Sequence, residues 1–145
     1  MIRITPDMFF DAKPVRRAVD RAKRSVLMRA GAFVRRRAQH LIRRRRRSAR
    51  PGEPPSSHTG LLRRFIYFGY QAERDEVVVG PVPLPGRQAY GPTTVPEVLE
   101  LGGTVTTFEN GEQEIRHYEG NPFMQPALEA ERDNFADLWA GSVKR

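Results

Sequence analysis

One continuous series of apolar residues, spaced three or four positions apart, runs through the first third of the chain and constrains its fold most strongly. The series comprises Val15, Val19, Ala22, Val26, Ala30, Phe33, Val34, Ala38, Leu41 and Ile42. This spacing is that of one face of an α-helix. Pro14 suits a first helical turn, and the next proline is Pro51. The sequence therefore predicts a helix over residues 14–47, about 50 Å long at about 1.5 Å per residue.

The last turns of this predicted helix are densely basic. Eight arginines fall within thirteen residues, namely Arg35, Arg36, Arg37, Arg43, Arg44, Arg45, Arg46 and Arg47. Five consecutive arginines cover the whole circumference of a helix, so none of its faces there can pack on an apolar core. A chain of 145 residues folds to a diameter of about 40 Å. We therefore expect the helix to project beyond its domain at the arginine end.

These arginines are candidate contacts with a partner. Like charges three or four positions apart destabilise a helix by about 0.2–0.5 kcal/mol per pair, so we expect an anionic group to order them. The alternatives are another subunit or ring, DNA phosphates, or a simply solvated end. No aromatic residues alternate with the arginines, and no helix-turn-helix or zinc-finger spacing is present. Any contact with DNA would therefore involve phosphates without base recognition.

Charge divides the chain into a basic and an acidic part. Residues 1–50 carry 17 Lys/Arg and 3 Asp/Glu, whereas residues 51–145 carry 8 Lys/Arg and 14 Asp/Glu. Such a chain can attract copies of itself head to side, or nucleic acid through the basic part alone. The chain has no cysteine, which excludes disulfides and thiolate metal sites. No apolar run is long enough to span a membrane.

The middle of the chain predicts a hairpin between two loops. Residues 48–59 form a Pro- and Ser-rich loop, residues 60–80 a β-hairpin preceded by a short helical turn, and residues 81–95 a Pro-rich irregular loop. A loop as long as the last one is uncommon in a small domain unless it binds a partner or moves. Arg87 and Tyr90 are our candidate contacts within it.

The last third of the chain predicts a second hairpin and a C-terminal helix. Residues 96–118 contain a short helix and two strands around Asn110-Gly111, a strong hairpin signal. Residues 122–141 have helical periodicity. The whole chain, residues 1–145, is therefore predicted to be one α+β domain. In it, the long N-terminal and C-terminal helices pack on an antiparallel β-sheet.

Four residues are expected to have structural roles. Thr59 would cap the helical turn that follows it, and Gly60 would supply a backbone angle that other residues avoid. Pro122 would fix the start of the C-terminal helix, and Phe123 would anchor that helix to the core.

No arrangement of residues indicates an enzyme, a metal site or a cofactor. The three histidines share no metal-ligand spacing. Ser57 and His58 are adjacent, which is poor geometry for a nucleophile and its base. Glu97 and Glu100 fall on one face of the short helix, where we expect two solvated carboxylates.

Four segments, in this order, carry a resemblance to a known family. They are the basic amphipathic N-terminal helix; Pro54–Arg64 with its Thr-Gly-Leu; Val98–Gly103, which ends in acidic, apolar and glycine residues; and Asn121–Leu128, a proline–aromatic entry to a helix. Together they resemble the small neck and tail-completion proteins of long-tailed bacteriophages, also described as minor tail or head–tail joining proteins. The match extends over nearly the whole chain.

The resemblance implies a structural virion protein without catalysis or cofactor, assembled in the host cytoplasm. It implies a homo-oligomeric ring, commonly hexameric, at the head–tail junction. Its partners would be the head connector or adaptor and the tail tube or terminator proteins, around the path of the DNA. The alternative is a nucleic-acid-binding protein without sequence specificity, which would use the arginine-rich helix.

Overall fold

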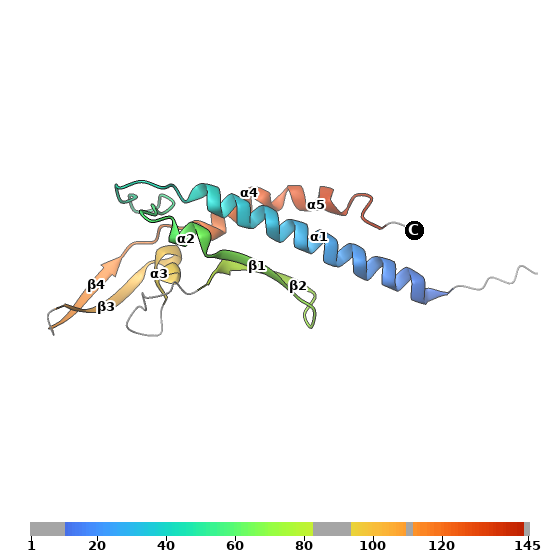
Figure 1. Cartoon of the computed structure of the whole chain (residues 1–145), viewed down its shortest axis with the longest axis horizontal. Helices are drawn as coiled ribbons and strands as arrows, with labels where there is room; N and C mark the ends of the chain where they lie inside the picture. The colour runs from blue at the N-terminus through green and yellow to red at the C-terminus, as the bar shows by residue number, and fades with distance from the viewer. Residues whose placement is uncertain (1–10, 83–93, 110–111, 144–145) are drawn as a thin grey trace, which may run out of the picture.

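The computed structural model describes residues 11–82, 94–109 and 112–143. Its elements are α1 (Ala12–Leu41), α2 (Leu61–Arg64), β1 (Ile66–Gln71), β2 (Glu76–Pro81), α3 (Val95–Leu101), β3 (Gly103–Glu109), β4 (Glu112–Tyr118), α4 (Met124–Arg132) and α5 (Asn134–Trp139). The predicted α+β class is confirmed. Helix α1 packs on β1–β2 and on α4–α5 (Figure 1).

The strands form two separate hairpins instead of the single sheet that we predicted. Strands β1 and β2 pair antiparallel, with Phe68 opposite Val79. Strands β3 and β4 pair antiparallel, with Gly103 opposite Tyr118. The first hairpin lies along α1, whereas the second extends away from the helices beyond α3 (Figure 1). Among the described residues, no strand of one hairpin pairs with a strand of the other.

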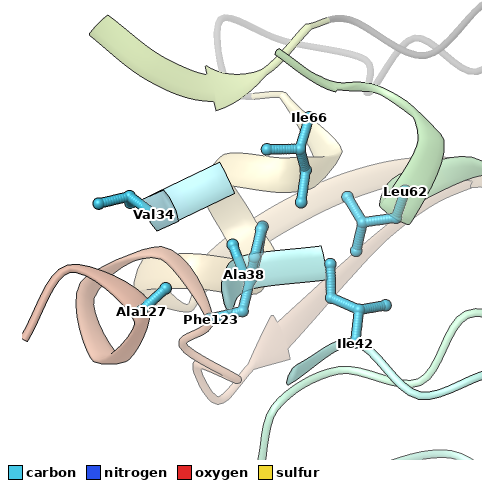
Figure 2. Close-up of a cluster of buried hydrophobic side chains, with 7 residues drawn as sticks. All are labelled: Val34, Ala38, Ile42, Leu62, Ile66, Phe123 and Ala127. Carbon is cyan, nitrogen blue, oxygen red and sulfur yellow. The ribbon is translucent and has the colours of Figure 1, made fainter. Parts of the chain in front are cut away.

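The main core lies around the second half of α1. Val34, Ala38 and Ile42 meet Leu62 and Ile66 from the α2–β1 segment and Phe123 and Ala127 from the start of α4 (Figure 2). Ile42, Ile66 and Phe123 are the largest fully buried side chains. Further toward the N-terminus, a smaller buried group joins Val26 and Ala30 of α1 to Leu138 of α5.

Gly31 sets how closely α1 approaches the first hairpin. A Cβ atom placed on Gly31 would lie 2.7 Å from Cγ2 of Val77 and 3.0 Å from Cδ2 of Phe68. Real Cβ atoms essentially never come as close as the first of these distances, and the second is a tight contact. From the sequence alone, Gly31 is only a weak point of the helix. In the structure its missing side chain lets β1–β2 lie directly on α1.

Helix α1 differs from the prediction of 14–47 at both ends. It begins at Ala12, where the carboxylate of Asp11 accepts a hydrogen bond from the backbone N–H of Lys13 at 3.0 Å. It ends at Leu41, because Ile42 turns into an extended conformation and buries its side chain in the core. The repulsion among the following arginines also disfavours another helical turn.

The projecting end of α1 is the N-terminal end and not the arginine end that we expected. Residues 11–17 and 19–21 are exposed, and the first turns extend past both β1–β2 and α5 (Figure 1). The reason is the position of the core, which gathers around Val34, Ala38 and Ile42. At about 1.5 Å per residue, the 30 residues of α1 span about 45 Å, more than the body of the domain covers.

The C-terminal helical region, predicted as one helix over 122–141, is two helices with a break at Asp133. Helix α4 starts at Met124, with Phe123 at the N-cap position. Pro122 therefore precedes the helix and does not occupy its first turn. Phe123 is fully buried, in the core next to α1. Within the described ranges, no helix is long and apolar enough to cross a membrane.

Candidate interaction surfaces

An open apolar groove of about 880 Å³ lies between the first hairpin and the C-terminal helices. Helix α1 forms its floor, β2 one wall and α4–α5 the other. The lining residues are Val26, Leu27, Ala30, Gly31, Val34, Glu76, Val77, Val78, Val79, Glu100, Leu101, Pro122, Met124, Gln125, Leu128, Phe135 and Trp139. We call this surface the apolar groove. The sequence predicts the apolar residues but not the space between them, because the space depends on how far apart the two walls lie.

Large apolar side chains reach solvent in the groove. Leu101 is 76% exposed and Trp139 is 46% exposed, and Leu128 and Val78 are also exposed. Contiguous exposed apolar surface on a small domain commonly marks an interaction site. The apolar groove therefore has the character of an interface that lacks its partner.

Glu100 closes one end of the apolar groove and holds α4 in place. Its carboxylate accepts hydrogen bonds from the backbone N–H groups of Phe123 at 2.8 Å, Met124 at 3.0 Å and Gln125 at 2.9 Å. These are unpaired donors at the start of a helix, where negative charge is also favourable. Our expectation of a solvated carboxylate at Glu100 was wrong, because its partners lie more than twenty residues away in sequence.

The charged residues in the lining of the apolar groove are acidic. They are Glu76 in the β2 wall and Glu100 at the end formed by α3. Glu129 is exposed on α4, one helical turn after the lining residue Gln125. A partner with positive charge beside its apolar residues would complement this rim.

The free end of α1, which we define as residues 12–21, has the opposite character. Val15 is 47% exposed and Val19 is 44% exposed. Both lie on the same helical stripe as the buried residues Ala22 and Val26. The free end contains four Lys/Arg and one Asp. It is thus a basic helix whose apolar stripe continues past the point where its own domain covers it.

The three arginines near the end of α1 that we singled out from the sequence make contacts within the chain. The Nε atom of Arg35 donates a hydrogen bond to the backbone oxygen of Ile66 at 2.7 Å, and its guanidinium lies over the ring of Tyr67. Arg36 lies over the ring of Phe33. Arg35 therefore holds β1 against α1, whereas Arg36 remains exposed on the helix surface beside Phe33.

Arg37 forms an ion pair with a buried carboxylate on α4. Its Nε atom donates to Oε1 of Glu131 at 2.7 Å, and Asn134 donates to the other carboxylate oxygen at 3.0 Å. Burial tends to raise the pKa of Glu131. The hydrogen bonds from Asn134 and Arg37 outweigh burial, so the pKa lies below its ordinary value. Glu131 is therefore ionised at neutral pH and links α4 to α1.

Arg43–Arg47 form an exposed, non-helical segment, which we call the arginine strip. Its backbone is held by a hydrogen bond from the N–H of Ser57 to the oxygen of Arg43 at 3.0 Å. Arg45 lies 3.9 Å from the carboxylate of Glu53. In the described part of the chain, the other four arginines of the strip have no ion pair. A small pocket of about 320 Å³ beside the strip is lined by His40, Leu41, Arg43, Arg45, Glu53 and Pro54.

The turn at Thr59-Gly60 leads into α2. Gly60 has a φ of 78°, in the left-handed region that favours glycine, and it occupies the N-cap position. Thr59 is therefore not the cap that we predicted. Its hydroxyl accepts a hydrogen bond from the N–H of Leu61 at 3.3 Å, while Ser57 Oγ accepts one from the N–H of Gly60 at 2.9 Å.

The tip of the first hairpin is tied to α1 by a polar cluster. Asp75 accepts hydrogen bonds from Lys23 Nζ at 2.5 Å and from the Tyr70 hydroxyl at 2.6 Å. The hydrogen bond from Lys23, followed by that from Tyr70, lowers the pKa of Asp75. The bond to Asp75 raises the pKa of Lys23. This cluster fixes the wall of the apolar groove formed by β2.

Two candidate contacts, Arg87 and Tyr90, lie outside the described residues. Among the described residues, no three His, Asp or Glu side chains are grouped so that they could hold a metal ion. Comparison of the chain with family models, curated proteins and solved structures found no match. Its function must therefore be inferred from its own surfaces.

Proposed function

We propose that this chain is a non-enzymatic structural subunit of a tailed-phage virion, forming a ring at the head–tail junction around the path of the DNA. Its ring would join the head connector or adaptor to the tail tube or terminator proteins. The order of the four segments that resemble neck and tail-completion proteins suggests this role. The observation that carries it is the pair of unmatched surfaces on one chain, a basic free helix end and an acidic apolar groove.

Self-assembly is the simplest use of two such surfaces. A subunit that carries a donor surface and a different acceptor surface binds its copies head to tail, and the series closes into a ring if the rotation per subunit allows it. Neither surface requires a ligand or a reaction. The fold is also small and well tied internally, as expected of a part that is repeated in an assembly.

The mass of the full chain in solution tests this proposal. Light scattering over a range of protein concentrations should give one discrete oligomer, alone or after mixing with head-connector or tail-tube proteins. Raising the salt concentration should lower the mass, because opposite charges contribute to the contact. A chain that stays monomeric alone and with both kinds of partner would contradict the proposal.

A second candidate function is binding of nucleic acid through the arginine strip. Four of its arginines lack an ion pair in the described structure, and exposed arginines of this kind can contact phosphates. We rank it second because residues 94–143 are strongly acidic and would repel nucleic acid.

Duplex DNA binding measured over a salt series separates the two functions. A phosphate-binding strip should give an affinity that falls steeply with salt, with a log–log slope near −0.9 for each phosphate neutralised. Replacing Arg44, Arg46 and Arg47 by glutamine should then reduce the slope by about 3. If the full chain does not bind DNA at physiological salt and forms a discrete oligomer, nucleic-acid binding is excluded and the structural function is supported.

A further inference from the structure

We propose that the free end of α1 docks into the apolar groove of a second copy of this chain. The inference rests on the proposed self-assembly and specifies the surfaces that carry it. Each copy would contribute the free end as donor and the apolar groove as acceptor, so every contact joins two different surfaces.

The free end cannot fill the groove of its own chain. Val26, Ala30 and Val34 of α1 line the floor of that groove, and residues 12–21 continue the same straight helix beyond it. Folding back would require breaking the helix between Val19 and Val26. The exposed apolar stripe and the exposed apolar groove can therefore meet only between copies.

The two surfaces match in polarity. The stripe offers Val15 and Val19, and the groove offers Leu101, Leu128 and Trp139, all of which are exposed in the single chain. A volume of about 880 Å³ has room for several aliphatic side chains. Laying the apolar face of an amphipathic helix into a groove is a common mode of protein recognition.

The two surfaces also match in charge. The free end carries four Lys/Arg and one Asp, while Glu76 lines the groove and Glu129 follows one helical turn after the lining residue Gln125. Successive residues of a helix are about 100° apart around its axis. Arg16 therefore lies beside the apolar stripe that contains Val15, and Arg17 lies on the helix face opposite that stripe.

Single substitutions on each surface test the docking. Val19→Glu places a charge in the stripe, and Leu101→Glu places one in the groove; both positions are exposed, so the fold should survive. Each variant alone should dissociate to the mass of one chain, with a dissociation constant raised at least about 100-fold. The control Arg29→Glu, at an exposed α1 residue outside both the free end and the lining of the groove, changes the charge by more than Val19→Glu does, yet it should leave the oligomer intact. Ile115→Glu, on exposed β4 outside the groove, should also leave it intact.

Mixing the two dissociated variants gives the sharpest result. The Val19→Glu chain keeps an intact groove, and the Leu101→Glu chain keeps an intact free end. An equimolar mixture should therefore form a heterodimer with one good interface, and nothing larger. Circular dichroism of each variant should match that of the unmodified chain.

The outcomes separate the two proposals. An unmodified chain that forms an oligomer, together with variants that also form it, would overturn the docking and leave the self-assembly standing. Dissociation by Ile115→Glu but not by Leu101→Glu would move the interface to the second hairpin and also overturn the docking. A chain that is monomeric at every concentration, alone and with partner proteins, would overturn both.

Discussion

The carboxylate of Glu100 accepts a hydrogen bond from the backbone N–H of Phe123 at 2.8 Å. Glu100 lies in the last turn of α3, and the ring of Phe123 is fully buried against α1. The contact therefore places the start of α4 and one of the largest core residues at the same time. It also fixes the corner where α3 and α4 close the apolar groove.

Replacing Glu100 by glutamine should destabilise the fold by about 1–2 kcal/mol. The glutamine amide has one acceptor oxygen in place of the two of the carboxylate, and it carries no charge. The three backbone N–H groups then compete for that single oxygen. Chemical denaturation measures the change. Glu119→Gln is the control, because Glu119 is exposed and makes none of these bonds; it should be neutral. Equal effects of the two substitutions would contradict the capping role.

Gly31→Ala should destabilise the protein by about 1–2 kcal/mol through overpacking. Alanine is the better helix former by about 1 kcal/mol, so a helix without a close neighbour would be stabilised instead. Here the new Cβ meets Val77, whose branched side chain is stiff. Adding Val77→Ala should recover most of the loss. A double-mutant cycle by thermal denaturation measures the coupling, and additive effects would argue against the close approach.

Glu131 should make the fold sensitive to acid. Its folded pKa lies below the ordinary value of 4.5, so the folded state favours the ionised form. The resulting stability is fully present above pH 4.5 and is lost as the pH falls through 4.5 and then through the lower folded pKa. The difference in unfolding free energy between the unmodified chain and Glu131→Gln should therefore shrink from pH 6 to pH 3. A constant difference would contradict this linkage.

Substitution of an arginine in α1 should reduce stability more than substitution of an arginine in the arginine strip. Arg37→Gln removes a partner of the buried Glu131 and should cost about 2 kcal/mol. Arg44→Gln and Arg46→Gln alter exposed side chains without a described ion pair and should change stability by less than about 0.5 kcal/mol. Thermal denaturation of the three variants, at one salt concentration, makes the comparison. A large loss for Arg44→Gln would mean that the arginine strip supports the fold.

The helices and hairpins that depend on residues close together in sequence were predictable. The spacing of Val26, Ala30, Val34 and Ala38 predicted the helix and its buried face, and the residues at each turn predicted both hairpins. The end of α1 was missed, because Ile42 continues the helical spacing but is drawn into the core by Leu62 and Ile66. The break at Asp133 was also missed, since the periodicity of the C-terminal region continues across it.

The interaction surfaces were only partly predictable. The split of charge along the chain indicated attraction between copies, but the density of Arg43–Arg47 predicted the wrong projecting end of α1. Which end of α1 projects depends on where Phe123 packs, and Phe123 lies 89 residues after Val34 in sequence. The role of Glu100 likewise depends on a partner that the chain brings near only after folding.

Helix α1 also has a mechanical meaning. It is one continuous helix. Its second half packs in the core, and a docked partner would apply force at its free end. A rod of about 45 Å turns a tilt of about 10° at its root into a displacement of about 8 Å at its tip. At Gly31 the backbone of α1 contacts β1–β2 without an intervening side chain. A tilt of the helix would therefore press directly on this hairpin. A force on the free end would thus be felt as torque by the first hairpin.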